Sequence, residues 1–86
     1  SHEVVTEVAV IGVPDDKWGE TVKALVVVES EITEQELIDY CREKLAHYKC
    51  PTSIEFRDEL ARTATGKLQK YKLRAPYWEG QDKQVN

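Results

Sequence analysis

A short stretch of the sequence combines small residues, a glycine and a lysine with further basic side chains. Residues 62–74 hold five Lys or Arg side chains and no Asp or Glu, so this basic segment carries a formal charge of +5. The other residues of the 86-residue chain sum to −9, and the whole chain has a formal net charge of −4. This charge asymmetry indicates that the basic segment faces an anion.

Lys67 is the residue of this segment best suited to chemistry. It follows Thr65 and Gly66 in a loop without bulky side chains, and its ammonium is a compact charge on a flexible stem. The stretch does not match the phosphate-binding P-loop GxxxxGK[ST], because Ala61 replaces the first Gly and Leu68 replaces the hydroxyl that would hold Mg²⁺. Judged from the loop alone, a solvated surface lysine is the alternative to a functional one.

Composition excludes several classes of protein. The acidic net charge argues against general nucleic-acid binding, and no apolar run is long enough to cross a bilayer. Cys41 and Cys50 belong to no CxxC or Cys/His cluster, so we expect neither a metal site nor a disulfide, and a reducing cytoplasm is the expected location. The basic segment therefore suits one small phosphate-bearing ligand.

Two apolar, β-branched runs at residues 8–13 and 21–29 predict strands buried on both faces. The connection PDDKWGE predicts an antiparallel hairpin with a wide loop. Within it, Gly19 is expected to adopt a backbone conformation that a side chain would resist, and Trp18 is expected to cover the end of the hairpin.

A helix is predicted to begin at a capping box formed by Thr33 and Glu36. It should end near residues 46–47, because Pro51 biases the residue before it toward extended geometry. Its apolar stripe consists of Leu37, Ile38, Cys41, Leu45 and Tyr48. Cys41 is therefore expected to be a small core residue rather than a reactive thiol.

The last third of the chain predicts one more strand and one more helix. Residues 52–57 alternate polar and apolar side chains, which is typical of an edge strand. Residues 68–75 have the composition of a short helix that Pro76 would end, with Tyr77 and Trp78 packed against the body of the domain. The predicted fold is α+β, a small three-stranded sheet in β-β-α-β-α order carrying helices, with a domain over residues 1–79 and a frayed polar tail over 80–86.

Three blocks of the sequence together resemble a known family. They are residues 5–28, which contain PDxxxGE; LAHYKCP at 45–51; and RTATGKLQK at 62–70. In this order and spacing they resemble the C-terminal domain of the adenylate-forming acyl-CoA synthetase superfamily, which includes acyl- and aryl-CoA ligases, luciferases and peptide-synthetase adenylation domains. The chain departs from the family pattern at Ala61, where the family often has Pro.

The resemblance implies a two-step reaction in which a carboxylate and ATP give an acyl-adenylate and pyrophosphate, and CoA then displaces AMP. It places Lys67 at the family's catalytic lysine, on a loop supported by Thr65 and Gly66. It also implies that the domain rotates between the two steps, with Arg42 and Lys49 as candidate CoA contacts and Glu20 as a candidate domain-interface residue. For Arg42, a solvated charge or a surface partner of Asp39 or Glu43 is the alternative.

The resemblance further implies that this chain is one part of a larger enzyme. ATP with Mg²⁺, the carboxylic acid and CoA would bind mainly to an absent, covalently linked N-terminal domain, and the 86 residues alone should be inactive. A medium- or long-chain fatty acid is the expected substrate. An aryl-CoA ligase domain and a free-standing binding or regulatory module of the same fold are the alternatives.

Overall fold

The computed structural model describes residues 2–46 and 49–80 and contains two helices and three strands there. In chain order these are β1 (Val5–Asp15), β2 (Gly19–Val28), α1 (Glu34–Lys44), β3 (Ser53–Phe56) and α2 (Lys70–Trp78). The predicted α+β class and the β-β-α-β-α order are confirmed. The predicted boundary at residue 79 is not tested, and residues 81–86 of the predicted tail lie outside the described part.

The three strands form one mixed sheet in the order β1-β2-β3. β1 and β2 are antiparallel, with Val5 opposite Val28 and Asp15 opposite Gly19, whereas β2 and β3 run parallel. Parallel neighbours need a long crossover, and α1 lies in that connection. β3 is an edge strand, as its alternating sequence predicts.

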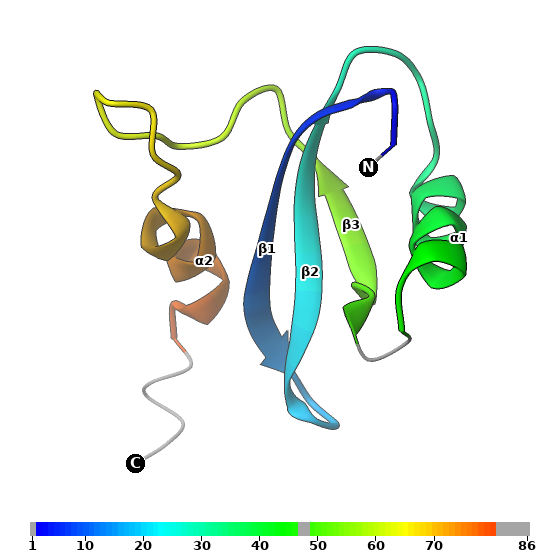
Figure 1. Ribbon diagram of the computed structural model, residues 1–86. Coiled ribbons are helices and arrows are strands. Elements are labelled where there is room, and N and C mark those ends of the chain that lie inside the picture. The colour runs from blue at the N-terminus through cyan, green and yellow to red at the C-terminus, as the bar shows by residue number, and fades with distance from the viewer. Residues whose placement is uncertain (1, 47–48, 81–86) are drawn as a thin grey trace.

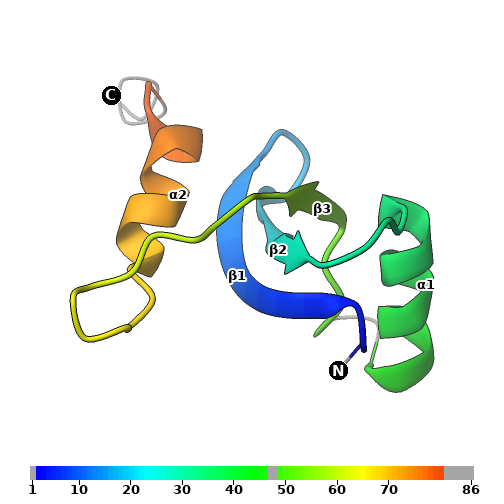
Figure 2. The ribbon, with the colours of Figure 1, turned by 90° about the horizontal axis from the view of Figure 1, so that it is seen from above.

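The sheet separates two layers, with α2 on one face and α1 on the other (Figures 1 and 2). Leu73 of α2 packs in a cluster that includes Ile11 and Val13 of β1. On the opposite face, Leu37 of α1 packs with Ala24, Val26 and Ile54. Successive β2 residues point to opposite faces, so the central strand is buried from both sides.

The hairpin between β1 and β2 is tight, which corrects the predicted wide loop. Only residues 16–18 separate the strands, because the Asp15 carboxylate accepts the amide hydrogens of Lys17 at 3.0 Å and Trp18 at 2.8 Å. Gly19 has a φ of +84°, which confirms its predicted special conformation. Trp18 is 73% exposed beyond the end of the sheet, so the prediction that it covers the hairpin was wrong.

β1 is buried on one face only, which corrects the prediction of a strand covered on both sides. Val8 and Val10 are 49% and 45% exposed, although they stand opposite the buried Val26 and Ala24. The reason lies in the layer arrangement: α1 packs over β2 and β3 and leaves this half of the sheet face open.

The capping box of α1 is confirmed. The Thr33 hydroxyl accepts the amide hydrogen of Glu36 at 3.1 Å, and the Glu36 carboxylate accepts that of Thr33 at 3.0 Å. The helix ends at Lys44, earlier than predicted, because Leu45 takes an extended conformation. Consequently Leu45 is 48% exposed rather than part of the apolar stripe, and Tyr48 lies outside the described residues.

α2 corrects the predicted helix over residues 68–75. Leu68 belongs to a β-bridge with Arg62, and the helix continues through Pro76 to Trp78. Pro76 removes one helical hydrogen bond. Contacts from the final turn to the sheet replace it: the Trp78 indole donates to the carbonyl of Gly12 at 2.9 Å, and the Tyr77 hydroxyl donates to Glu55 at 2.5 Å. The predicted packing of Tyr77 and Trp78 is thereby confirmed.

Candidate functional site

The loop that carries Lys67 is a small hairpin between β3 and α2. Arg62 and Leu68 form an antiparallel bridge, and the amide of Thr63 donates to the carbonyl of Lys67 at 2.8 Å. Closer to the tip of the hairpin, the amide of Gly66 donates to the carbonyl of Thr63 at 2.9 Å. These backbone bonds give the segment 62–68, here called the lysine loop, a defined shape.

Gly66 and two threonines set the conformation of the loop tip. Gly66 has a φ of +92°, a region that side chains disfavour, although a Cβ there would meet no atom within 4 Å. The Thr63 hydroxyl accepts the amide hydrogen of Lys67 at 3.1 Å and lies 3.1 Å from the hydroxyl of Thr65. The glycine is thus needed for its backbone angle rather than for space.

Arg62 ties the lysine loop to the sheet. Its Nε and Nη2 donate to one oxygen of Glu7 on β1, at 3.0 and 2.7 Å, and its Nη1 donates to the carbonyl of Gly66 at 2.7 Å. Neither contact could be predicted from the sequence, because Glu7 and Arg62 are 55 positions apart and no local pattern joins them.

The side chain of Lys67 is exposed and forms neither a hydrogen bond nor an ion pair with any residue that the structure describes. Lys70 and Lys72 are also exposed on α2, so the whole segment presents positive charge to its surroundings. Lys67 differs from them in lying on a loop rather than in a helix; its amide is bonded to Thr63 and its neighbour Gly66 to Arg62.

The other candidate residues lie elsewhere. Arg42 is exposed on α1, in the layer opposite α2, and lines a hollow of about 350 Å³ together with Gln35, Ile38, Cys50, Pro51 and Thr52. It does not pair with Asp39, whose carboxylate instead accepts a hydrogen bond from Gln35 at 2.8 Å. Lys49 is exposed close by in sequence, after residues 47–48, and its amide donates to the carbonyl of Ala46 at 2.9 Å. Residues 47–48 of the LAHYKCP block are outside the described residues.

Glu20 lies at the far end of the sheet from the lysine loop. It stands opposite Pro14, whereas Arg62 contacts Glu7, seven positions earlier on β1 and therefore about 23 Å away along an extended strand. Its carboxylate lies against the backbone of Gly12, where an added Cβ would come within 1.8 Å of the Glu20 oxygen. The structure therefore distributes the predicted site residues over three separate places.

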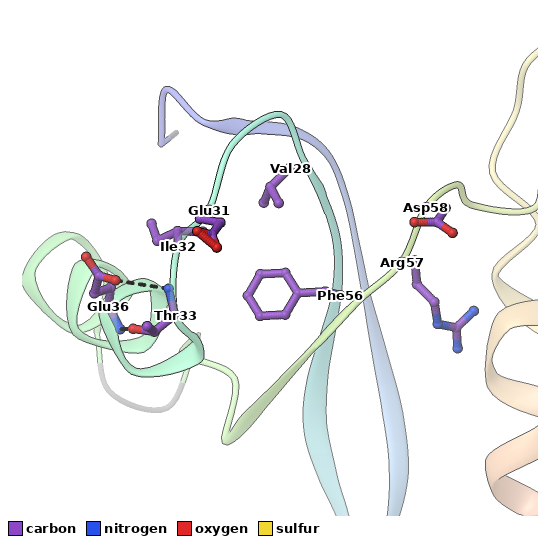
Figure 3. Close-up of a pocket in the computed structure, with 8 residues that line it drawn as sticks. All are labelled: Val28, Glu31, Ile32, Thr33, Glu36, Phe56, Arg57 and Asp58. Carbon is purple, nitrogen blue, oxygen red and sulfur yellow. Dashed lines mark hydrogen bonds between the residues drawn. The ribbon is translucent and has the colours of Figure 1, made fainter.

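A larger hollow of about 490 Å³ lies between the start of α1 and the end of β3 (Figure 3). It does not contain Lys67 and is lined by Val28, Glu31, Ile32, Thr33, Glu36, Phe56, Arg57 and Asp58. Three of these residues are acidic, and the guanidinium of Arg57 points away from the hollow (Figure 3) toward Glu55 and Tyr77, which it contacts at 2.6 and 2.8 Å. This hollow therefore does not suit an anionic ligand.

The shifted pKa values belong to groups that hold the fold together. The hydrogen bond from Tyr77, and secondarily Arg57, lowers the pKa of Glu55, while burial and the Glu55 contact raise the pKa of Tyr77. Partial burial also raises the pKa of the Cys41 thiol, but Cys41 belongs to neither core cluster, so its predicted role as a core residue is not confirmed. Cys41 and Cys50 are free thiols.

The described residues contain no group of three or more His, Cys, Asp or Glu side chains able to hold a metal ion. Neither helix within them has the length and apolar character required to span a bilayer.

Known proteins match most of the chain. Residues 1–67 match the family described as the AMP-binding enzyme C-terminal domain. The chain is 47% identical over 78 residues to the probable CoA ligase CCL11 of Humulus lupulus, covering 86% of this chain but 14% of that protein. It is 49% identical over 74 residues to the 2-succinylbenzoate–CoA ligase of Bacillus cereus, covering 86% of this chain and 15% of that protein.

Solved structures of CoA synthetases contain the same fold. A fatty acyl CoA synthetase of Mycobacterium tuberculosis superimposes with a TM-score of 0.84 and 45% identity, over 90% of this chain and 16% of that one. The chain thus spans only about one seventh of the length of the curated relatives it matches. The family match, the identities and the shared fold lead to one conclusion: the chain belongs to the family of AMP-binding enzyme C-terminal domains.

Proposed function

We propose that this chain is the catalytic-lysine domain of an ATP-dependent acyl-CoA ligase. The observation that carries the proposal is Lys67, an unpaired cation at the end of a loop whose backbone is held by its own hydrogen bonds. The similarity to CoA ligases from a plant and two bacteria supports it.

In the first step, a carboxylate oxygen of the substrate bonds to the α-phosphorus of ATP. The bond from that phosphorus to the bridging oxygen breaks, and pyrophosphate leaves with its Mg²⁺. Negative charge gathers where the carboxylate and the α-phosphate meet. The ammonium of Lys67 offsets that charge and holds the two anions together.

In the second step, the thiol of CoA releases its proton to solvent and its sulfur attacks the acyl carbon. The carbon–sulfur bond forms as the bond to AMP breaks. Arg42 and Lys49 are the proposed contacts for CoA, and Glu20 is the proposed domain-interface residue. Arg42 lies on α1, Lys67 lies in the loop that leads into α2, and the two helices cover opposite faces of the sheet (Figure 2). A rotation of the domain would therefore exchange one face for the other at a fixed nucleotide site.

The remaining parts of the site are proposed to lie in a covalently linked N-terminal domain. Lys67 is exposed and lines neither of the two hollows described above, so the lysine loop is proposed not to bind ATP, CoA or an acyl chain by itself. The relatives are several times longer than this chain, which supports a larger enzyme, proposed here to be cytoplasmic.

A medium- or long-chain fatty acid is our proposed substrate. The fatty acyl CoA synthetase of Mycobacterium tuberculosis supports it at 45% identity. An aryl-CoA ligase is the alternative, favoured by the 2-succinylbenzoate–CoA ligase at 49%. Since relatives of similar identity carry different substrate names, the specificity is proposed to reside outside this domain.

The test is the substitution Lys67→Ala in the full ligase chain. The rate of acyl-adenylate formation should fall by about 10²–10³-fold, the cost of removing one transition-state donor. CoA transfer from supplied acyl-adenylate should stay within twofold. Lys72→Ala, which removes an equal charge from the exposed face of α2, is the matched control and should change neither step. Equal loss of both steps in Lys67→Ala would contradict the proposed role.

A further inference from the structure

We infer that Arg62 is the positioning residue for Lys67 and that Glu7 is its anchor on the sheet. The inference rests on the proposed function of Lys67. It assigns to Arg62 a role in the adenylation step that is exerted through the lysine and not through the substrate.

Arg62 holds the peptide unit that leads into Lys67. The carbonyl of Gly66, which accepts from Arg62 Nη1 at 2.7 Å, belongs to the peptide bond that leads directly into Lys67. The amide hydrogen at the other end of that same peptide bond is donated to the Thr63 hydroxyl at 3.1 Å. Both polar groups of the Gly66–Lys67 peptide are therefore fixed, so the direction in which the lysine side chain leaves the loop is fixed as well.

Gly66 has wide conformational freedom of its backbone, because it has no side chain. Its φ of +92° lies in a region that glycine shares with several other accessible conformations. No atom surrounds the position of its missing side chain, so packing cannot hold it. The hydrogen bond from the Gly66 amide to the Thr63 carbonyl restrains one side of the glycine, and the contact from Arg62 to the Gly66 carbonyl restrains the other.

Glu7 anchors Arg62 to the sheet. Two nitrogens of the same guanidinium donate to Glu7, so Arg62 connects the lysine loop to a residue inside the β1 ladder. A planar guanidinium can bind two partners at once in a fixed geometry, which an ammonium cannot. Glu7 also neutralises Arg62, so Lys67 keeps the net charge of the loop.

These contacts separate positioning from stability. The ion pair is partly exposed, with side-chain exposures of 39% for Arg62 and 31% for Glu7, and such pairs contribute little to folding. Misplacement of a reacting group by about 1 Å, in contrast, can slow a reaction about 10²-fold. Loss of Arg62 should therefore affect the adenylation rate far more than the melting temperature.

The test uses step-resolved kinetics in the full ligase chain. Arg62→Ala should slow acyl-adenylate formation by about 10–100-fold, leave CoA transfer from supplied acyl-adenylate within twofold, and raise KM for ATP little. Glu7→Ala should give a smaller loss in the same step. Lys72→Ala, which removes one positive charge from the same segment, serves as the control for a simple change of potential.

The decisive comparison is made in the absence of the lysine. If Arg62 acts only through Lys67, Arg62→Ala should cause no further loss of single-turnover adenylation in the Lys67→Ala background. A further loss of tenfold or more there would overturn the inference, because Arg62 would then contact the reacting groups itself. Undiminished adenylation in Arg62→Ala with Lys67→Ala inactive would overturn it too, while leaving the proposed function intact. Full adenylation by Lys67→Ala would overturn both.

A second measurement guards against a folding defect. Amide hydrogen exchange at Gly66 and Lys67 should become faster in Arg62→Ala, while exchange in β1 and β2 stays unchanged. Arg62→Lys keeps the charge but cannot span both partners, so it should fold normally and recover only part of the lost rate. Complete recovery in Arg62→Lys, or unchanged exchange at the loop in Arg62→Ala, would contradict the positioning role.

Discussion

At the scale of single residues, Arg62 and Lys67 are two cations of the same loop that differ in their contacts. Arg62 is satisfied by Glu7 and by the carbonyl of Gly66, whereas Lys67 has no partner among the described residues. The unpaired ammonium of Lys67 is free to contact a substrate, whereas the paired guanidinium of Arg62 holds the loop in place. The chemistry proposed for Lys67 depends on this difference.

Replacement of Lys67 by Arg should fail almost as completely as replacement by Ala. A guanidinium keeps the charge but is planar and larger than the compact ammonium placed between two anions. We expect the adenylation rate of Lys67→Arg to fall by at least about tenfold, measured by pyrophosphate release. Lys70→Arg, on the exposed face of α2, is the control. Near-normal adenylation in Lys67→Arg would show that the loop acts through its electrostatic potential alone.

At the scale of elements, the lysine loop depends on what holds β3 and α2 in place. Tyr77 of α2 donates to Glu55 of β3, and Arg57 contacts both at 2.8 and 2.6 Å. The indole of Trp78 adds a bond to β1. The loop thus starts after a strand and ends at a helix that are linked directly to each other, which limits its movement relative to the sheet.

Tyr77→Phe should lower the stability of the domain and change its pH dependence. Loss of the hydroxyl removes a hydrogen bond to Glu55 and should cost about 1 kcal/mol near pH 7, measured by urea unfolding. The contact lowers the pKa of Glu55, so its contribution is present above the ordinary value of 4.5 and is lost as the pH falls through the lowered pKa. The pKa of Tyr77 is raised from 10.0, so its contribution is present below pH 10 and is lost as the pH rises through the raised pKa.

The matched control for this prediction is Tyr71→Phe. Tyr71 is 65% exposed on the same helix, so its variant should keep the stability and the pH profile of the original chain. An unchanged acid and alkaline profile in Tyr77→Phe would contradict the role given to the Glu55 contact.

At the scale of the whole molecule, the distribution of charge and layers fits a domain that works against a partner. The segment of +5, residues 62–74, lies in a chain whose remainder is −9, and it contains the lysine loop and the first half of α2. Neither of the two hollows described above contains Lys67. The charge of the lysine loop therefore lies outside both of them.

Residues 1–86 produced alone should release no pyrophosphate from ATP and a fatty acid above the uncatalysed background, whereas the full ligase should. The physical reason is that a positioned cation cannot assemble two anionic substrates without a site that binds them. Activity of the isolated chain would contradict the proposed division between domains. Purification from the native source adds a second check, since a free 86-residue product would favour the binding or regulatory module.

Much of the local structure followed from the sequence. The capping box at Thr33 and Glu36 sets the start of α1 through contacts three residues apart. Gly19 marks a turn because the turn requires a positive φ, which glycine adopts readily. The order of elements and the loop with Lys67 were also predictable, because periodicity, turn residues and motifs are local properties. The errors lay where tertiary contacts override local signals. Pro76 did not end α2, since Tyr77 and Trp78 hold the last turn against the sheet.

The sequence by itself therefore determined the order of the elements, and it singled out Lys67 as the lysine proposed for chemistry. Only the tertiary structure decided that Val8 and Val10 are exposed, because exposure depends on where α1 lies and not on hydrophobicity. It also decided that Glu7 meets Arg62 across 55 positions. Pairings of that kind arise from the packing of the lysine loop and β1 in three dimensions, and here such a pairing fixes the backbone from which Lys67 extends.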